Sequence, residues 1–156
     1  MVMADRIAIL DAGRIAQLGS PEEVYNRPNS PFVASFMGAG NVLELEARPA
    51  GNGIEIQAGS HNDALFISGH SLAGPVKAHF RSEAARLGPA DARAADRLLL
   101  RGRIVQASYP GGFYRYAVAV GQNQFMVDDT RRLAVGEMVG IGLPVSSLHF
   151  FSRREA

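Results

Sequence analysis

LLLRGRIVQASYPGGFYRYAVAVGQNQFMVD, residues 98–128, is the stretch that most directly indicates the fold class of this chain. It holds three runs rich in β-branched, aromatic and other apolar residues, separated by short turns. The runs are Leu98–Ala107, Phe113–Val120 and Gln124–Asp128. Pro110-Gly111 suits the central positions of a type II turn, and Gly121-Gln122-Asn123 suits a hairpin connection. The stretch therefore predicts three consecutive strands joined by tight turns.

Shorter runs of the same kind lie on both sides of this stretch. They are Asn41–Ala47, Ile54–Ala58, Ala64–Ile67, Val76–Arg81 and Met138–Leu143. Gly140 and Gly142, inside the last run, indicate a bend or a close approach of another backbone segment. Ser82–Arg97, rich in Ala and Arg and broken by Gly88-Pro89, predicts a loop with some helical character. Short strands at a spacing of about 8–12 residues favour a small barrel or sandwich, and five-stranded OB-like barrels have this size.

The first 38 residues have a different pattern from this β region. Arg6–Leu10 and Arg14–Leu18 are short β-rich runs joined by Asp11-Ala12-Gly13, which suits a hairpin with its glycine in the left-handed conformation. Ser20-Pro21-Glu22-Glu23 then predicts the start of a short helix. Its Ser and its second Glu can form a capping box, and its Pro needs no amide at the first helical position. Arg27-Pro28 ends this helix.

A second short helix is predicted to begin at Asn29-Ser30-Pro31 and to end at Gly38. The apolar residues on one face of it are Phe32, Val33, Phe36 and Met37. A segment of this size is too small to bury the stripe by itself. We therefore expect the stripe to be covered by the β region, residues 39–156, or by a second copy of the chain.

The composition excludes several classes of protein. The chain of 156 residues has no Cys, which excludes disulfide scaffolds, zinc–cysteine fingers, iron–sulfur sites and thiol nucleophiles. Its formal net charge of +1 gives little general attraction to nucleic acid. No apolar run approaches the roughly 18 residues of a membrane span, and the first ten residues lack the pattern of a signal peptide. We expect an ordinary soluble protein of a reducing compartment.

Few residues in the sequence could carry chemistry. The single Lys, Lys77, follows Val76 rather than a glycine, so the chain has no phosphate-binding P-loop. The four histidines are His61, His70, His79 and His149, and no two of them have the helical i,i+4 spacing of metal ligands. Glu22-Glu23 already serves the predicted helix cap, and Asp128-Asp129 lies at a strand end. We therefore predict no catalytic residue, no cofactor site and no metal site.

Phe113-Tyr114-Arg115-Tyr116 interleaves aromatic residues with an Arg on a predicted strand, as surfaces that stack nucleic-acid bases do. Residues 101–156 carry seven Arg and four acidic residues. We expect the alternate aromatics to fill the barrel and Arg115 to face water, because the charge is small and the flanking strand residues are Ala and Val. The alternative is a free-standing OB-type binder of single-stranded nucleic acid or of a small oxyanion.

ADRIAILDAGRIAQLGSPEEVYNRP, residues 4–28, closely resembles the end of the nucleotide-binding domain in ATP-binding cassette (ABC) importer ATPases. In that family an Asp-Arg-Ile hairpin follows the switch histidine, and a Gly-Ser/Thr-Pro-Glu-Glu helix comes next. FVASFMG, residues 32–38, together with Asn41, resembles the family's exit from that domain. The resemblance implies that residues 1–38 are the end of a nucleotide-binding domain. The Walker A loop, signature motif, Walker B acid and switch histidine would precede Met1, and the chain would be a C-terminal fragment.

Residues 39–156 resemble the TOBE domain, an OB-like β module of such ATPases. Phe80-Arg81-Ser82-Glu83 stands where the family often has Arg-Pro-Glu, with Ser in place of Pro. Gly102-Arg103-Ile104-Val105, Tyr109-Pro110-Gly111-Gly112 and Tyr116 follow the family's Gly-x-Val, Tyr-Leu-Gly and strand-Tyr pattern, with Pro in place of Leu. Val135-Gly136-Glu137-Met138-Val139 matches its Gly-Asp/Glu-x-Val turn. The implied fold is mainly β: an OB-like barrel preceded by the hairpin and two short helices.

The resemblance implies a regulatory and dimerisation domain of an importer's ATP-binding subunit, without catalysis of its own. In the intact family a homodimer of this subunit binds ATP and Mg²⁺ and docks on membrane permease subunits at the cytoplasmic face, and paired TOBE domains stabilise the dimer. The candidate interface or effector residues are Arg81, Tyr109, Gly112 and Arg115. The transported solute is left open, because sugar, polyamine, iron, sulfate and phosphate-ester importers share these modules.

Overall fold

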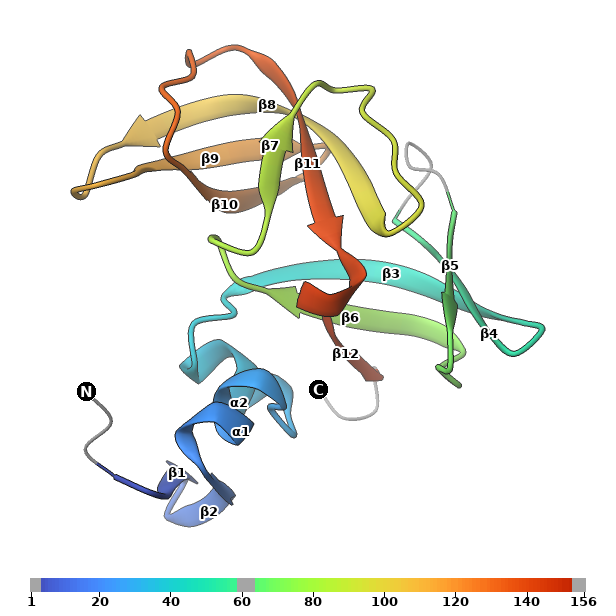
Figure 1. Cartoon of the computed structure of the whole chain (residues 1–156). Helices are drawn as coiled ribbons and strands as arrows, with labels where there is room; N and C mark the ends of the chain where they lie inside the picture. Colours follow the sequence, from blue (N-terminus) through green and yellow to red (C-terminus); the bar gives the residue numbers. More distant parts are fainter. Residues whose placement is uncertain (1–3, 59–63, 153–156) are drawn as a thin grey trace.

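A computed structural model describes residues 4–58 and 64–152, which form an N-terminal segment and two five-stranded sheets (Figure 1). The N-terminal segment comprises β1 (Ile7–Asp11), β2 (Arg14–Gly19), α1 (Pro21–Asn26) and α2 (Pro31–Phe36). The sheets contain strands β3 to β12 and a single 3-10 turn, η1 (Val145–Ser147). The predicted mainly β class, with a hairpin and two short helices before the β region, is confirmed. No helix among the described residues is long and apolar enough to cross a membrane.

The hairpin and the helix starts follow from local sequence. The hairpin turns on two residues rather than three: Ala12 and Gly13 both have positive φ, 46° and 80°, as in a type I′ turn. The predicted capping box of α1 is present, since Ser20 Oγ accepts from the Glu23 amide at 3.2 Å and Glu23 Oε2 accepts from the Ser20 amide at 2.9 Å. Ser30 caps α2 through the amide of Val33. Both helices therefore begin where the sequence predicts.

The apolar stripe of α2 is only partly covered. Val33 is fully buried, but it packs with Ile9 of the hairpin and Val24 of α1 rather than with the β region. Met37 packs at the edge of the same small cluster. Phe36 stays 64% exposed. The N-terminal segment thus has a small core of its own, and part of the stripe faces solvent.

One five-stranded sheet has the order β12-β6-β3-β4-β5, with every neighbouring pair antiparallel. Its strands are β3 (Asn41–Ala50), β4 (Gly53–Gln57), β5 (Leu65–Ser68), β6 (Gly74–Phe80) and β12 (His149–Ser152). The last strand, β12, is not among the predicted strands. It pairs with β6, which places His149 opposite His79.

The other five-stranded sheet has the order β10-β9-β8-β11-β7 and is also antiparallel throughout. Its strands are β7 (Arg86–Gly88), β8 (Arg97–Ser108), β9 (Tyr114–Val120), β10 (Asn123–Asp129) and β11 (Met138–Pro144). The consecutive strands β8, β9 and β10 are those predicted from residues 98–128. β8 is long enough to pair with β11 along its first part and with β9 along its second.

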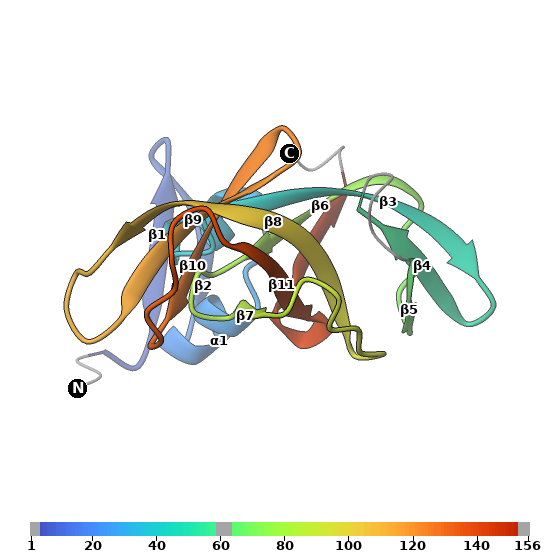
Figure 2. The same cartoon turned by 90° about the horizontal axis from the view of Figure 1, so that it is seen from above.

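The two sheets share one hydrophobic core. Ile54 and Ile56 of one sheet and Leu100, Ile104 and Ile141 of the other are completely buried in the same cluster. Seen from above, the long strands β3 and β8 extend across the β region (Figure 2). The chain also crosses between the sheets near its end, because β11 pairs with β8 and β7 whereas the next strand, β12, pairs with β6 of the other sheet. The two sheets are therefore packed together as one unit.

Ser82–Arg97, which the structure describes in full, corrects one prediction. It consists of turns, the three-residue strand β7 and, at Arg97, the first residue of β8, instead of a loop with helical character. β7 pairs with β11 at the edge of its sheet. A strand of three residues is too short to show a periodic pattern, and its conformation is set by its partner.

Three glycines, Gly53, Gly102 and Gly140, mark close approaches between backbone segments. A Cβ atom on Gly140 would lie 2.5 Å from the carbonyl oxygen of Pro89, and a Cβ atom on Gly102 would lie 2.5 Å from that of Ala119. Ordinary van der Waals contacts are far longer than this, so a side chain does not fit at either position.

The close approach predicted at Gly140 is confirmed. At Gly142, named in the same prediction, a Cβ atom would lie 3.3 Å from the Arg97 side chain and 3.5 Å from the Arg86 carbonyl oxygen, so no close backbone approach is present there.

Asn41, the first residue of β3, covers the free edge of β10. Its Nδ2 donates to the Met126 carbonyl at 2.9 Å, and its Oδ1 accepts from the Met126 amide at 2.8 Å. The Asp128 amide, two residues further along the same edge, donates to the Ser82 carbonyl at 2.9 Å. These bonds satisfy part of the edge that β10 would otherwise offer to another strand.

Candidate functional site

The four candidate residues from the sequence lie in different places. Tyr109 follows β8 and lines a surface groove. Gly112, in the β8–β9 connection, has a φ of 78°, a conformation that favours glycine. Arg115 on β9 pairs with Asp128 on β10, and Arg81 contacts the N-terminal segment. The structure therefore does not gather them into a single site.

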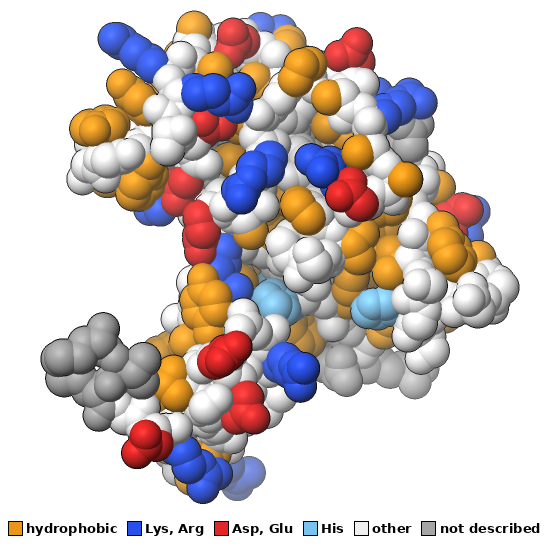
Figure 3. All heavy atoms as spheres, in the orientation of Figure 1, with side chains coloured by type: hydrophobic (Ala, Val, Ile, Leu, Met, Phe, Trp, Pro, Cys, Tyr) orange, Lys and Arg blue, Asp and Glu red, His pale blue; other side chains and the backbone are white. Residues whose placement is uncertain are grey.

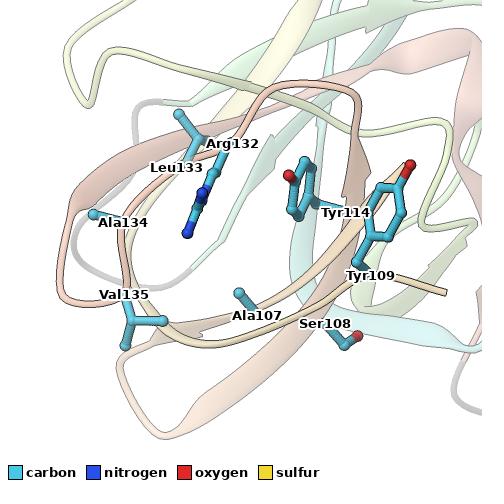
Figure 4. Close-up of a pocket in the computed structure, with 8 residues that line it drawn as sticks. All are labelled: Ala107, Ser108, Tyr109, Tyr114, Arg132, Leu133, Ala134 and Val135. Carbon is cyan, nitrogen blue, oxygen red and sulfur yellow. The ribbon is translucent and has the colours of Figure 1, made fainter. Parts of the chain in front are cut away.

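The groove beside Tyr109, here called the aromatic groove, has a volume of about 570 Å³ and lies between the end of β8, the start of β9 and the loop before β11 (Figure 4). Its lining residues are Ala107, Ser108, Tyr109, Tyr114, Arg132, Leu133, Ala134 and Val135. The rings of Tyr109 and Tyr114 have centroids 4.9 Å apart, and Tyr114 stacks on Tyr116 at 6.0 Å. Tyr109 is 62% exposed and Tyr116 is fully buried. A row of three tyrosines thus runs from solvent into the core.

Tyr116 positions the wall of the groove opposite the strands. Its hydroxyl donates to the Arg131 carbonyl at 2.8 Å and accepts from the Leu133 amide at 2.8 Å. These two partners flank Arg132, so the loop is held on both sides of that residue. Side chains two apart on a strand share a face, which is why Tyr114 lines the groove above Tyr116.

Arg132 is the only charged residue of the aromatic groove, and its side chain is drawn across the groove from Tyr114 (Figure 4). Within the described part of the chain its guanidinium makes no hydrogen bond or ion pair. Its neighbour Arg131 is fully engaged: it binds both oxygens of Asp129 and donates to the Leu87 carbonyl at 2.5 Å. As far as the described residues go, the groove therefore carries one uncompensated positive charge.

Arg115 lies on the opposite face of β9 from the tyrosines. Its Nε and Nη2 donate to the two carboxylate oxygens of Asp128 at 2.7 and 2.8 Å, and Ser82 Oγ donates to the same carboxylate at 2.8 Å. The hydrogen bond from Arg115, helped by that from Ser82, holds the pKa of Asp128 below its usual range. The expectation that Arg115 faces water is therefore only half correct: its side chain is partly exposed, but its charge is paired.

Arg81 is 8% exposed and joins the β region to the N-terminal segment. Its Nη2 donates to the Tyr25 carbonyl at 2.7 Å, and its Nε donates to the Met37 carbonyl at 3.3 Å. Its guanidinium lies 3.6 Å from the centroid of the Tyr25 ring, within the range of a cation–π contact. The Tyr25 hydroxyl donates to Glu83 Oε1 at 3.2 Å. We call this set of contacts the Arg81 junction.

Two histidines on neighbouring strands complete the Arg81 junction. His79 Nδ1 lies 3.3 Å from the Ala39 carbonyl and 3.4 Å from Ser35 Oγ, and His149 Nε2 lies 3.5 Å from Arg81 Nη1. Burial lowers the pKa of His79. Burial also lowers the pKa of His149, and the adjacent Arg81 charge lowers it further. Both rings are therefore neutral near pH 7.

A second groove, of about 520 Å³, lies on the Arg115 side of the sheet. Its lining residues are Glu83, Arg86, Leu87, Phe113, Asp128, Asp129, Thr130 and Arg131. The charges of Asp128, Asp129 and Arg131 are compensated by ion pairs. Within residues 4–58 and 64–152, no three His, Asp or Glu side chains gather closely enough to hold a metal ion.

Sequence reasoning did not identify Arg132, His79 or His149 as functional candidates. Arg132 stands out only because its guanidinium has no partner among the described residues, and this depends on the fold. The histidines come together because β12 pairs with β6, and β12 is not among the predicted strands. The alternation of Tyr114 and Tyr116 with Arg115 did indicate that the tyrosines share one face and the arginine the other.

Comparison with known proteins gives the family context. Residues 80–151 match the family described as TOBE domain. The chain is 33% identical over 132 residues to the spermidine/putrescine import ATP-binding protein PotA of Acidothermus cellulolyticus, covering 81% of this chain and 34% of that protein. It is 30% identical over 155 residues to PotA of Borreliella afzelii, and this match covers 96% of this chain and 41% of that protein. It is 38% identical over 96 residues to the sn-glycerol-3-phosphate import ATP-binding protein UgpC of Jannaschia sp., and this match covers 62% of this chain and 27% of that protein.

A solved structure supports the fold. The cytoplasmic molybdate-binding protein ModG, with molybdate bound, aligns with a TM-score of 0.55 at 15% identity, covering 70% of this chain and 94% of ModG. At that identity the likeness concerns the fold alone. The chain spans about two fifths or less of the curated relatives named above. Residues 80–151 thus match the TOBE domain family, and the chain is similar over most of its length to ATP-binding subunits of ABC importers.

Proposed function

We propose that this chain is the regulatory and dimerisation part of an ABC importer ATP-binding subunit and performs no chemistry itself. The observation that carries the proposal is the Arg81 junction. It connects the segment that resembles the end of a nucleotide-binding domain to the two sheets through Arg81, Tyr25 and Met37. A buried guanidinium with fixed partners on both sides holds the two parts in one orientation. A change in the sheets is thereby passed to the N-terminal segment.

The surface of the N-terminal segment supports its place beside a larger ATPase body. Leu10, Ile15 and Leu18, on the hairpin, are 49–62% exposed, while Ile9 is buried against α1 and α2. The hairpin is therefore apolar on both faces, and the exposed outer face is of the kind that contacts another part of a protein. We assign this contact to the nucleotide-binding body of the longer relatives.

The proposed partners are a second copy of the chain and, in the intact importer, membrane permease subunits at the cytoplasmic face. ATP and Mg²⁺ belong to the nucleotide-binding body in this proposal. The curated relatives are named for spermidine/putrescine and for sn-glycerol-3-phosphate. Because these solutes carry opposite charges, the proposal leaves the solute class open.

Dimerisation is tested by sedimentation of the chain over a range of concentrations. We expect a reversible monomer–dimer equilibrium, with the dimer predominant at the highest concentration. In parallel, addition of ATP and Mg²⁺ should produce neither phosphate release nor a binding signal. A chain that stays monomeric at every concentration contradicts the dimerisation role, and phosphate release contradicts the assignment as non-catalytic.

The alternative function is that of a free-standing binder of single-stranded nucleic acid or of a small oxyanion, and its nucleic-acid form is disfavoured by the charges. Arg115, the one cation among the β9 aromatics, is neutralised by Asp128. Basic and acidic side chains are interspersed on the face shown in Figure 3. Such a surface offers little phosphate attraction. Salt-sensitive binding of an oligonucleotide by the chain would nevertheless establish this alternative.

A further inference from the structure

We propose that the aromatic groove binds a small molecule that joins a planar ring to a carboxylate or a phosphate, either directly or through a short linking group. This inference goes beyond the regulatory role above and does not depend on whether the chain dimerises. It rests on three features of the groove: its preformed shape, its uncompensated charge and its exposed aromatic surface.

The shape of the groove suits a small molecule. Its volume of about 570 Å³ falls within the roughly 300–1,000 Å³ of small-molecule sites. The Tyr116 hydroxyl fixes both residues that flank Arg132, so the wall that carries this arginine is ordered before any ligand arrives. A preformed wall lowers the entropic cost of binding.

The charge of the groove selects an anion. Arg132 is the only charged lining residue and is without a hydrogen-bond or ion-pair partner in residues 4–58 and 64–152. The second groove, of about 520 Å³, differs in this respect, because the carboxylates of Asp128 and Asp129 that line it already form ion pairs with arginines. A guanidinium binds carboxylate and phosphate through paired hydrogen bonds. An anionic ligand would therefore gain the partner that Arg132 lacks.

The tyrosines select a planar ring. Tyr109 and Tyr114 form a tilted pair with centroids 4.9 Å apart, and Tyr109 exposes 62% of its surface. Aromatic rings stack on such surfaces in offset or edge-on arrangements. Leu133 and Val135 add apolar lining on the side of the loop (Figure 4). A ligand whose ring stacks on the tyrosines and whose anionic group faces Arg132 would make both kinds of contact at once.

The test is a set of titrations of the chain followed by amide NMR shifts and tyrosine fluorescence. AMP and benzoate are the aromatic anions, adenosine is the ring without charge, and inorganic phosphate is the charge without a ring. We expect saturable shifts at Leu133, Val135 and Ala107 with AMP or benzoate. Adenosine and phosphate should each bind more weakly by about tenfold or more, because each lacks one of the two contacts.

Two variants assign the site. Arg132→Ala should weaken binding of the aromatic anions by about tenfold or more, and Tyr109→Ala should do the same through loss of stacking. Arg48→Ala, at an exposed position of β3 in the other sheet, is the matched control and should leave binding unchanged. Both test residues are surface-exposed, so the variants should fold, which the unshifted spectrum of the core verifies.

Three results would overturn the proposal. One is the absence of saturable binding of AMP and of benzoate up to about 10 mM. Another is phosphate binding as tight as that of AMP, which would identify a simple oxyanion site. The last is unchanged binding in Arg132→Ala, which would place the ligand elsewhere. None of these results affects the sedimentation test of dimerisation, so the two proposals fail separately.

Discussion

Single residues decide how the N-terminal segment is attached to the sheets. The buried guanidinium of Arg81 is satisfied by two backbone carbonyls of that segment and lies against the Tyr25 ring. An arginine at the end of a strand ordinarily has its side chain exposed to solvent. Here, the backbone of α1 and the end of α2 supply acceptors at the position where β6 ends. The role of Arg81 is therefore to position the segment, and a ligand would have no access to its buried side chain.

Replacement of Arg81 by Met tests this role. The variant leaves the Tyr25 and Met37 carbonyls without their donor at a partly buried contact and removes the cation–π contact with Tyr25, so we expect the free energy of unfolding to fall by about 2 kcal/mol. Urea denaturation measures the change. Arg48→Met, at an exposed position on β3, is the matched control and should change stability by less than about 0.5 kcal/mol. Equal effects in the two variants would contradict the positioning role.

The histidines of the Arg81 junction predict a dependence of stability on pH. Burial lowers the pKa of both His79 and His149 below the ordinary value of about 6.5 that the unfolded chain has. His149 faces Arg81 and His79, and His79 also senses Lys77. Below about pH 6.5 the unfolded chain binds more protons than the folded chain. Stability is thus full above about pH 6.5 and falls as the pH drops toward the folded-state pKa values.

Urea unfolding measured between about pH 7.5 and 5 tests this sign. His149→Gln keeps a polar side chain but removes one titrating group, so the fall in stability over this range should become smaller. An identical pH dependence in the variant and in the original chain would show that His149 does not contribute.

Pairs of strands decide where side chains are tolerated. Gly102 on β8 lies so close to β9 that a Cβ atom there would be 2.5 Å from the Ala119 carbonyl oxygen. A Cβ atom on Gly88 of β7 would have no heavy atom within 4 Å, because β7 lies at the edge of the sheet. The same residue type therefore has a packing role at one position and none at the other.

Substitution of these two glycines by Ala provides a matched pair. Gly102→Ala must separate β8 from β9 and should lower the free energy of unfolding by about 1–3 kcal/mol. Gly88→Ala should change it by less than about 0.5 kcal/mol. Thermal unfolding followed by circular dichroism measures both. A Gly102→Ala variant as stable as the original chain would mean that the sheet relaxes without cost.

The whole molecule is built on cores of unequal size. The small cluster of Ile9, Val24 and Val33 holds the N-terminal segment, whereas both sheets share one large cluster that includes Ile104 and Val118. Local opening is easiest where few apolar contacts must be broken. The N-terminal segment should therefore open independently of the sheets.

Hydrogen exchange tests this order of opening. The Val24 amide, which donates to the Ser20 carbonyl at 3.0 Å, should exchange faster than that of Val118 at the centre of β9. Arg81→Met should accelerate exchange at Val24 more than at Val118, because it detaches only the segment. Equal protection of the two amides would instead show that the chain unfolds as one unit.

The hairpin, both helix starts and the three strands of residues 98–128 could be predicted from local sequence. Turn geometry, capping and strand alternation act within a few residues, so the sequence carries them directly. It also indicated that the β9 tyrosines and Arg115 point to opposite faces. Four outcomes came from the fold: β12 returns to β6, β7 is a strand, Arg81 is buried and Arg132 has no partner among the described residues. These outcomes depend on contacts between segments far apart in the chain, and a buried charge or an unpaired one is defined only by what the fold places around it.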